Sequence, residues 1–139
     1  MPPIARSFLS IVGGMAVAVL VVILMDKLGA MIHPLPAGFD PRVTAQVNAH
    51  IATAPFGAML VMVSGWVLAP FSGGLVATKL SGRPGTMYVW AIMLLFLSTT
   101  LVNLGTYVHP PWMWLVATAG IPGAGWLAAR LVSGPAPAA

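Results

Sequence analysis

Apolar residues run along this chain in four long blocks, and polar residues gather in the short stretches that separate them. Inside each block the apolar residues follow one another without polar alternation, which argues against half-exposed strands. A helix needs about 20 mostly apolar residues to cross a membrane, because the hydrocarbon core is about 30 Å thick. The pattern therefore predicts an all-α fold, a four-helix antiparallel transmembrane bundle, with helices at about residues 7–32, 51–79, 86–108 and 112–131.

The stretch between the first two blocks carries the signals of a turn followed by a new helix. Asp40 precedes Pro41. An aspartate can cap free backbone N–H groups, and proline fits the first position of a helix. We therefore expect a short interfacial helix at residues 41–50 that leads directly into the second span, with a bend at Pro55.

The remaining boundaries are marked by glycine and proline. Gly82 suits the left-handed position that ends a helix, and Pro84 prevents the helix from continuing. We expect residues 1–132 to form a single four-span transmembrane domain. The last residues, 133–139, are expected to be a disordered tail.

Composition agrees with a lipid environment and excludes several chemistries. The chain is 59% hydrophobic and 6% charged, whereas soluble domains carry about 25% charged residues. It contains no cysteine, which excludes thiol–disulfide exchange and cysteine-ligated metal centres. The six basic residues are scattered, so they form no stripe for a nucleic acid. The lipid bilayer is the partner that the composition predicts.

The basic residues also predict an orientation, because cytoplasmic segments of membrane proteins are enriched in lysine and arginine. Four spans place both ends of the chain on the same side. That side collects four basic residues, and the opposite side holds two, each close to an aspartate: Arg6, Lys79, Arg83 and Arg130 against Lys27 and Arg42. We therefore expect both termini in the cytoplasm.

Small residues recur on the faces of two blocks. Lipid tails are as apolar as leucine, so membrane helices associate where small side chains let backbones approach closely. Every fourth residue of the second block is glycine or alanine with one exception, and the fourth block is similar. The residues expected to pack helices are Gly57, Gly65, Ala69, Gly73, Ala77, Gly120, Gly123 and Gly125.

Two blocks contain an internal proline, which leaves a carbonyl four residues earlier without its helical donor. The prolines are Pro70 and Pro122, and glycines flank the second one. Such prolines commonly serve as kinks for packing. The alternative is a locally broken helix at residues 112–131 that lines a transport path, as paired interruptions do in some transporters.

Polar groups inside spans are costly, so each is a candidate for function. Asp26, near the end of the first span, is either an interfacial carboxylate that helps to end that span or a proton or cation site. Asn103 in the third span either hydrogen-bonds between helices or lines a polar path.

All three histidines, His33, His50 and His109, fall on the predicted outer face. Three imidazoles can bind a transition metal or sense pH, but histidine is also ordinary at a span boundary. Because no two of them have the i,i+4 spacing of a helical site, we expect no metal and no cofactor. With no glutamate and two aspartates, paired-carboxylate catalysis is not expected, and we expect no catalytic residues and no enzyme.

Short segments in a fixed order give the chain a resemblance to a family. They are "HPLPAGFDP" from His33, "HIATAP" from His50, "GGLVATKL" from Gly73, "VNLGTYVHPPWMW" from Val102 and "PGAGWLAARL" from Pro122. Together they resemble small, uncharacterised four-span proteins of the bacterial inner membrane. The resemblance implies that membrane as the location and implies no activity.

Two functions fit these patterns. The first is an accessory or structural subunit whose Gly/Ala-rich faces bind another copy of the chain or a larger complex, respiratory or photosynthetic. The second is a small oligomeric transporter or channel that uses Asp26, Asn103 and the helix at residues 112–131. Four short helices leave little room for a pore, so transport would require an oligomer.

Overall fold

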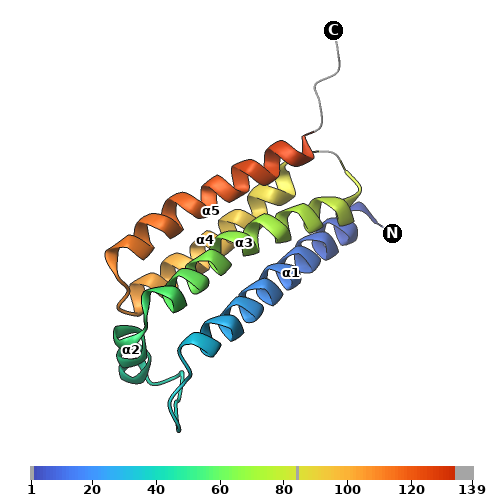
Figure 1. Ribbon diagram of the computed structural model, residues 1–139. Helices are drawn as coiled ribbons and strands as arrows, with labels where there is room; N and C mark the ends of the chain where they lie inside the picture. The colour runs from blue at the N-terminus through green and yellow to red at the C-terminus, as the bar shows by residue number, and fades with distance from the viewer. Residues whose placement is uncertain (1, 84, 134–139) are drawn as a thin grey trace.

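A computed structural model describes residues 2–83 and 85–133, and within them the chain forms five helices and no strand. Four long helices lie side by side in alternating directions, and a short helix lies across one end of the bundle (Figure 1). Each long helix is long and apolar enough to cross a membrane. The all-α fold is confirmed, with the candidate spans of a multi-pass membrane protein. The helices are α1 Pro3–Ile32, α2 Thr44–Thr53, α3 Phe56–Ser81, α4 Met87–Thr106 and α5 Pro111–Val132.

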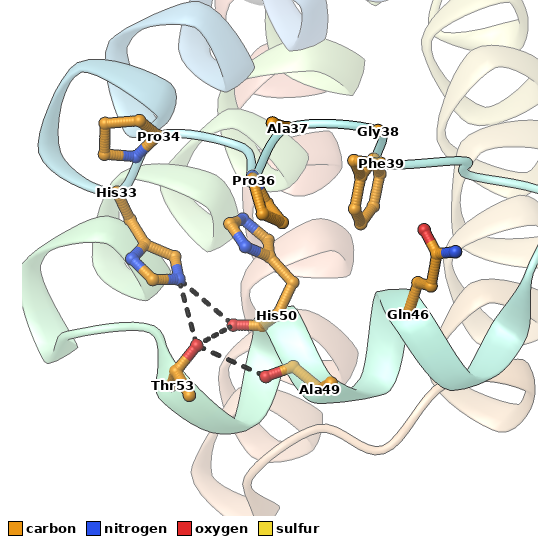
Figure 2. Close-up of a pocket in the computed structure, with 10 residues that line it drawn as sticks. All are labelled: His33, Pro34, Pro36, Ala37, Gly38, Phe39, Gln46, Ala49, His50 and Thr53. Carbon is orange, nitrogen blue, oxygen red and sulfur yellow. Dashed lines mark hydrogen bonds between the residues drawn. The ribbon is translucent and has the colours of Figure 1, made fainter.

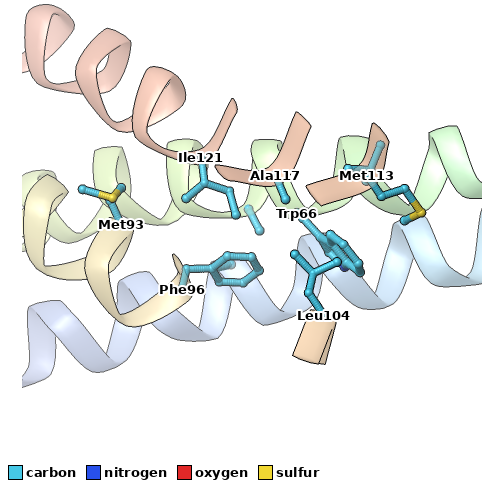
Figure 3. Packing of buried hydrophobic residues seen from close by; sticks show 10 residues of the cluster. Trp66, Met93, Phe96, Leu104, Met113, Ala117 and Ile121 are labelled. Atoms are coloured by element: carbon cyan, nitrogen blue, oxygen red, sulfur yellow. The ribbon is translucent and has the colours of Figure 1, made fainter. Parts of the chain in front are cut away.

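The third helix, α3, is the centre of the bundle. It lies between α1 and α5 and also packs on α4, whereas α1 packs almost entirely on α3 (Figure 1). The largest group of buried apolar side chains draws on all four long helices, and Trp66 of α3 lies among residues of α4 and α5 (Figure 3). Its other large members include Met93, Phe96, Leu104 and Ile121.

The junction between the short helix and the second span differs from the expected bend. α2 runs to Thr53, and Ala54 has an extended backbone with ψ of 130°. Pro55 then precedes the first residue of α3. The clash of a proline ring with the residue before it disfavours the helical conformation there. Pro55 therefore separates two helices, and the second span begins at Phe56 rather than at residue 51.

The expected helix start at Asp40-Pro41 is wrong. α2 begins at Thr44, after an extended Val43. The Asp40 carboxylate instead accepts the backbone N–H of Arg42 at 2.9 Å, because a short acidic side chain competes well for nearby backbone donors in turns. The helical end at Gly82 is confirmed: its φ is +59°, and its N–H donates to the Lys79 carbonyl. Pro84 and residues 134–139 lie outside the described residues.

Neither internal proline interrupts its helix. α3 continues through Pro70 and α5 continues through Pro122. The alternative of a locally broken helix at residues 112–131 is therefore wrong, because α5 is continuous from Pro111 to Val132. The Thr118 hydroxyl, which lies one turn before Pro122, donates to the Trp114 carbonyl at 2.6 Å.

Candidate functional site

The candidate site is an open pocket of about 440 Å³ at the end of the bundle where α2 lies. The chain leaves α1 at His33, turns through the loop before α2 and returns along α2, so the loop and the short helix form the walls (Figure 2). The side chains that matter for the site are those of His33, Phe39, His50 and Thr53. All of these residues lie outside the four candidate spans.

Two imidazole rings line this pocket side by side. The rings of His33 and His50 stack with centroids 4.2 Å apart and an interplanar angle of 18°. The ring of Phe39 lies against His50, with centroids 5.6 Å apart. Figure 2 shows the two imidazoles side by side, one from the end of α1 and one from α2. We name this arrangement the His33–His50 pair.

The backbone around His33 directs its ring toward α2. Its N–H closes the last turn of α1 on the Gly29 carbonyl at 2.9 Å, and its own φ and ψ of −136° and 84° leave the helix. Pro34 follows, and the residue before a proline disfavours helical geometry. The histidine therefore ends α1 and turns its side chain onto the neighbouring helix.

The His33 ring caps the end of α2. Its Nε2 lies 3.1 Å from the His50 carbonyl oxygen, and a carbonyl only accepts, so this nitrogen carries the proton. The Thr53 hydroxyl donates to the same oxygen at 3.1 Å. Carbonyls in the last turn of a helix lack helical donors. The ring and the hydroxyl supply donors to one of these carbonyls, and the ring ties the end of α1 to α2.

The third histidine does not join the other two. His109 lies in the turn between α4 and α5, where its Nδ1–H donates to the Tyr107 carbonyl at 3.1 Å. Its ring meets Trp66 edge-on with centroids 5.6 Å apart, and it is 9% exposed. Within residues 2–83 and 85–133, no three acidic or histidine side chains are grouped to hold a metal ion.

The surroundings of His50 and of His109 favour the neutral imidazole. Burial lowers the pKa of His50, and the nearby charge that His33 can carry lowers it further. Burial also lowers the pKa of His109, although the hydrogen bond to the Tyr107 carbonyl acts in the opposite direction. The arrangement disfavours protonation of His50 while the pair is stacked.

A second contact fixes α2 to the bundle, and the sequence reasoning missed it. The Asn48 side-chain oxygen accepts the backbone N–H of Val108 at 2.9 Å. Because Val108 follows α4, this bond joins α2 to the turn that precedes α5. The sequence offered one indication of this hydrogen bond: α2 and the turn before α5 were both expected at the same end of the bundle.

The two polar candidates inside the spans have different surroundings. Asp26 is exposed on α1. The Oδ1 atom of Asn103 is buried and has no hydrogen-bond partner among the described residues. The hydroxyls of Thr99 and Thr106, each about one helical turn from Asn103, bond to carbonyls of their own helix, those of Phe96 and Val102.

Several of the small residues lie where helices meet most closely. A Cβ added to Gly73 would stand 2.6 Å from the carbonyl oxygen of Gly14, so α1 and α3 touch backbone to backbone. Gly65 lies close to Met25 of α1, since a Cβ added to Gly65 would be 2.8 Å from the Met25 Cβ. Ala69 and Ala77, on the same ridge, are fully buried.

The small residues of α5 divide into two kinds. Gly120 faces Val67 of α3 and Gly125 faces Met93 of α4, with 2.8 Å and 2.7 Å between an added Cβ and the nearest side-chain atom. Gly123 of α5 and Gly57 of α3 are exposed, and apart from chain neighbours and their own helix backbone no described atom lies within 4 Å of a Cβ added there. A packing role for those two stays a prediction.

A polar contact at the other end of the bundle also escaped the sequence reasoning. The hydroxyls of Ser7 in α1 and Tyr88 in α4 lie 2.9 Å apart. The Arg6 side chain reaches the Leu80 carbonyl near the end of α3, at 3.4 Å. These bonds fasten the first turns of α1 to both neighbours. The sequence could have indicated this contact, because a serine and a tyrosine lie near the same end of two predicted spans.

Comparisons of this chain with protein-family models, with curated proteins and with solved structures find no match. The functional conclusion therefore rests on the described residues themselves. Their geometry offers a capped junction at one end, close helix contacts in the middle and a largely uncovered first helix.

Proposed function

We propose that this chain is a small integral protein of the bacterial inner membrane, with four spans and both termini in the cytoplasm. It serves there as an accessory or structural subunit that binds another copy of itself or a larger membrane complex. The observation that carries the proposal is the position of α1 at the edge of the bundle. Of its 30 residues only Ser10, Gly14 and Ala18 are buried.

The internal packing favours a binding surface over a reaction site. The glycines at the tightest contacts of α3 are already used inside the chain, against α1 and α4. The faces left for a partner therefore include the far side of α1 and the open positions at Gly57 and Gly123. In lipid such faces are stabilised by packing against another helix, because close van der Waals packing rather than the hydrophobic effect drives helix association there.

A second candidate function is transport by an oligomer, and one observation favours it. The buried Oδ1 of Asn103 lacks a partner among the described residues, and an unsatisfied polar atom in a membrane bundle is costly. Water entering the bundle along a transport path would give that oxygen a donor.

Isolation of the chain from its native membrane in a mild detergent tests the proposal. We expect a stable assembly of fixed stoichiometry, measured by native mass spectrometry. A chain that runs as a lone monomer under conditions that preserve other membrane complexes would contradict it.

Flux measurements separate the two candidates. The chain reconstituted in liposomes should not move protons or monovalent cations if it is a structural subunit. Transport would instead give a flux that is lost in Asp26→Asn and retained in Asp40→Asn, a matched control because Asp40 lies outside the spans. That result would replace the subunit proposal.

A further inference from the structure

The far side of α1 carries a regular row of positions, which we name the α1 seam: Val12, Ala16, Val19, Ile23, Asp26 and Ala30. Successive members are separated by four and three residues in alternation. An average repeat of 3.5 residues is the spacing at which two helices pack as a left-handed pair. The first five members are exposed and the sixth is partly exposed.

The seam lies opposite the face that α1 uses inside the chain. Gly14 and Ala18 are buried against α3. Each helical residue turns the chain by about 100°, so Ile23 points about 180° away from Gly14. A second helix can therefore lie along the seam without disturbing the contact between α1 and α3.

Two adjacent charged residues favour the binding of a second copy of α1 along the seam. Asp26 is a member of the seam, and Lys27 stands beside it. Consecutive residues on a helix do not face each other, so the two side chains flank the middle of the seam on opposite sides. When two identical helices meet around a two-fold axis, the left side of one faces the right side of the other. Asp26 of each copy then faces Lys27 of the other.

A membrane imposes the orientation that this pairing requires. Copies inserted with the same topology bring equal depths together, so Asp26 and Lys27 meet at one level. Asp26 lies six residues before the end of α1, which is about 9 Å along the axis. A carboxylate this close to hydrocarbon is costly while it lacks a partner, and Ala16 and Ala30 let the two backbones approach.

We propose that the α1 seam binds a second copy of this chain, as a parallel two-fold dimer with two reciprocal Asp26–Lys27 ion pairs. The two α1 helices cross at about 20°, the angle of left-handed pairs. This inference rests on the proposed function and narrows it, because it names self-association as the use of the uncovered face.

Single cysteines test the seam directly, since the chain contains no cysteine of its own. The full chain in membrane vesicles, treated with a mild oxidant, should form disulfide dimers in Ala16→Cys and Ile23→Cys. Leu24→Cys and Leu28→Cys are matched controls, because these positions are off the seam but 53% and 50% exposed, against 46% for Ile23. The controls should give about tenfold less dimer; equal yields at Leu24 and Ile23 would overturn the proposal.

Charge reversal tests the ion pairs. In the Ile23→Cys background, Asp26→Lys and Lys27→Asp should each lower the dimer yield by roughly tenfold, because two modest pairs become repulsive. When the two reversed chains carry different tags and are made together, each should pair with the other and restore the original yield. Unchanged yields in the single reversals, or no preference for the mixed dimer, would contradict the pairing.

These results are distinguishable from a failure of the proposed function. Absence of seam cross-links together with a stoichiometric complex containing another membrane protein overturns the dimer and leaves the subunit proposal intact. Absence of seam cross-links in a chain isolated as a monomer overturns both.

Discussion

The two faces of α1 show how differently one helix can be built on opposite sides. The side toward α3 carries the small buried residues Ser10, Gly14 and Ala18, and at Gly14 it excludes even an added methyl group. The opposite side carries branched residues such as Val19 and Ile23, 48% and 46% exposed. In water the large apolar residues would be inside. In lipid they gain little from burial, so close approach of backbones decides which side faces inward.

The largest predicted effect comes from filling the inner face. Gly14→Val places a side chain where an added Cβ would stand 2.6 Å from the Gly73 carbonyl oxygen and 2.7 Å from the Ala77 Cβ. Because backbone cannot yield as a flexible side chain does, we expect a loss of about 3 kcal/mol in the free energy of unfolding. Denaturation by sodium dodecyl sulfate, followed by circular dichroism in micelles, measures it.

Leu24→Ala is the control on the exposed side of the same helix. Leu24 is 53% exposed, so its truncation should change the free energy of unfolding by less than about 0.5 kcal/mol. If the truncation proved as damaging as the enlargement of Gly14, the contrast between the two faces would be wrong.

A smaller effect is expected where polar atoms rather than backbones join α1 to its neighbours. Tyr88→Phe removes one partner of the 2.9 Å contact with the Ser7 hydroxyl. Hydrogen bonds between membrane helices contribute about 0.6 kcal/mol on average, so we expect a loss of that size in the same denaturation measurement. Ser7→Ala combined with Tyr88→Phe should cost no more than either change alone; fully additive losses would show that the hydroxyls do not interact.

The smallest predicted effect is a loss of stability at the junction between α1 and α2 as the pH falls. The folded protein lowers the pKa of His50 and of His109, so below the ordinary value the unfolded chain binds more protons than the folded one. Stability that is present above about pH 6.5 is therefore lost as pH falls toward the lowered values. Faster hydrogen exchange of α2 amides at pH 5 than at pH 7.5, after correction for intrinsic rates, is the expected result.

His50→Phe separates the titration from the stacking in that experiment. Phenylalanine can stack on His33 but takes up no proton, so the acid effect on α2 should shrink to the part contributed by His109. An undiminished acid effect in this variant would exclude His50 as its cause.

Hydrophobic length was enough to predict the four long helices, because a span needs a fixed number of apolar residues whatever its neighbours are. Gly82 was equally predictable, since its left-handed backbone suits glycine. The start of α2 was not, because the Asp40 carboxylate can serve a turn or a helix end equally well, and only the path of the loop decides. The separation of α2 from α3 followed from Pro55, whose effect was underestimated as a bend.

The candidate site was predictable only as a set of residues. The sequence places His33, His50 and His109 near one end of the bundle, but loop geometry decides that two rings stack while the third meets Trp66. The same limit applies to the glycines of α3. Gly73 and Gly74 are adjacent in sequence yet approach different helices, α1 and α4, and no repeat in the sequence specifies which.

The pairing of α1 with α3 has a consequence for biosynthesis. Chains are made from the N-terminus, and early segments begin to fold before later ones exist. Because α1 packs mainly on the very next span, its backbone contact at Gly14 and Gly73 can form as soon as α3 has entered the membrane. The α1–α3 pair then provides the surface on which α4 and α5 pack.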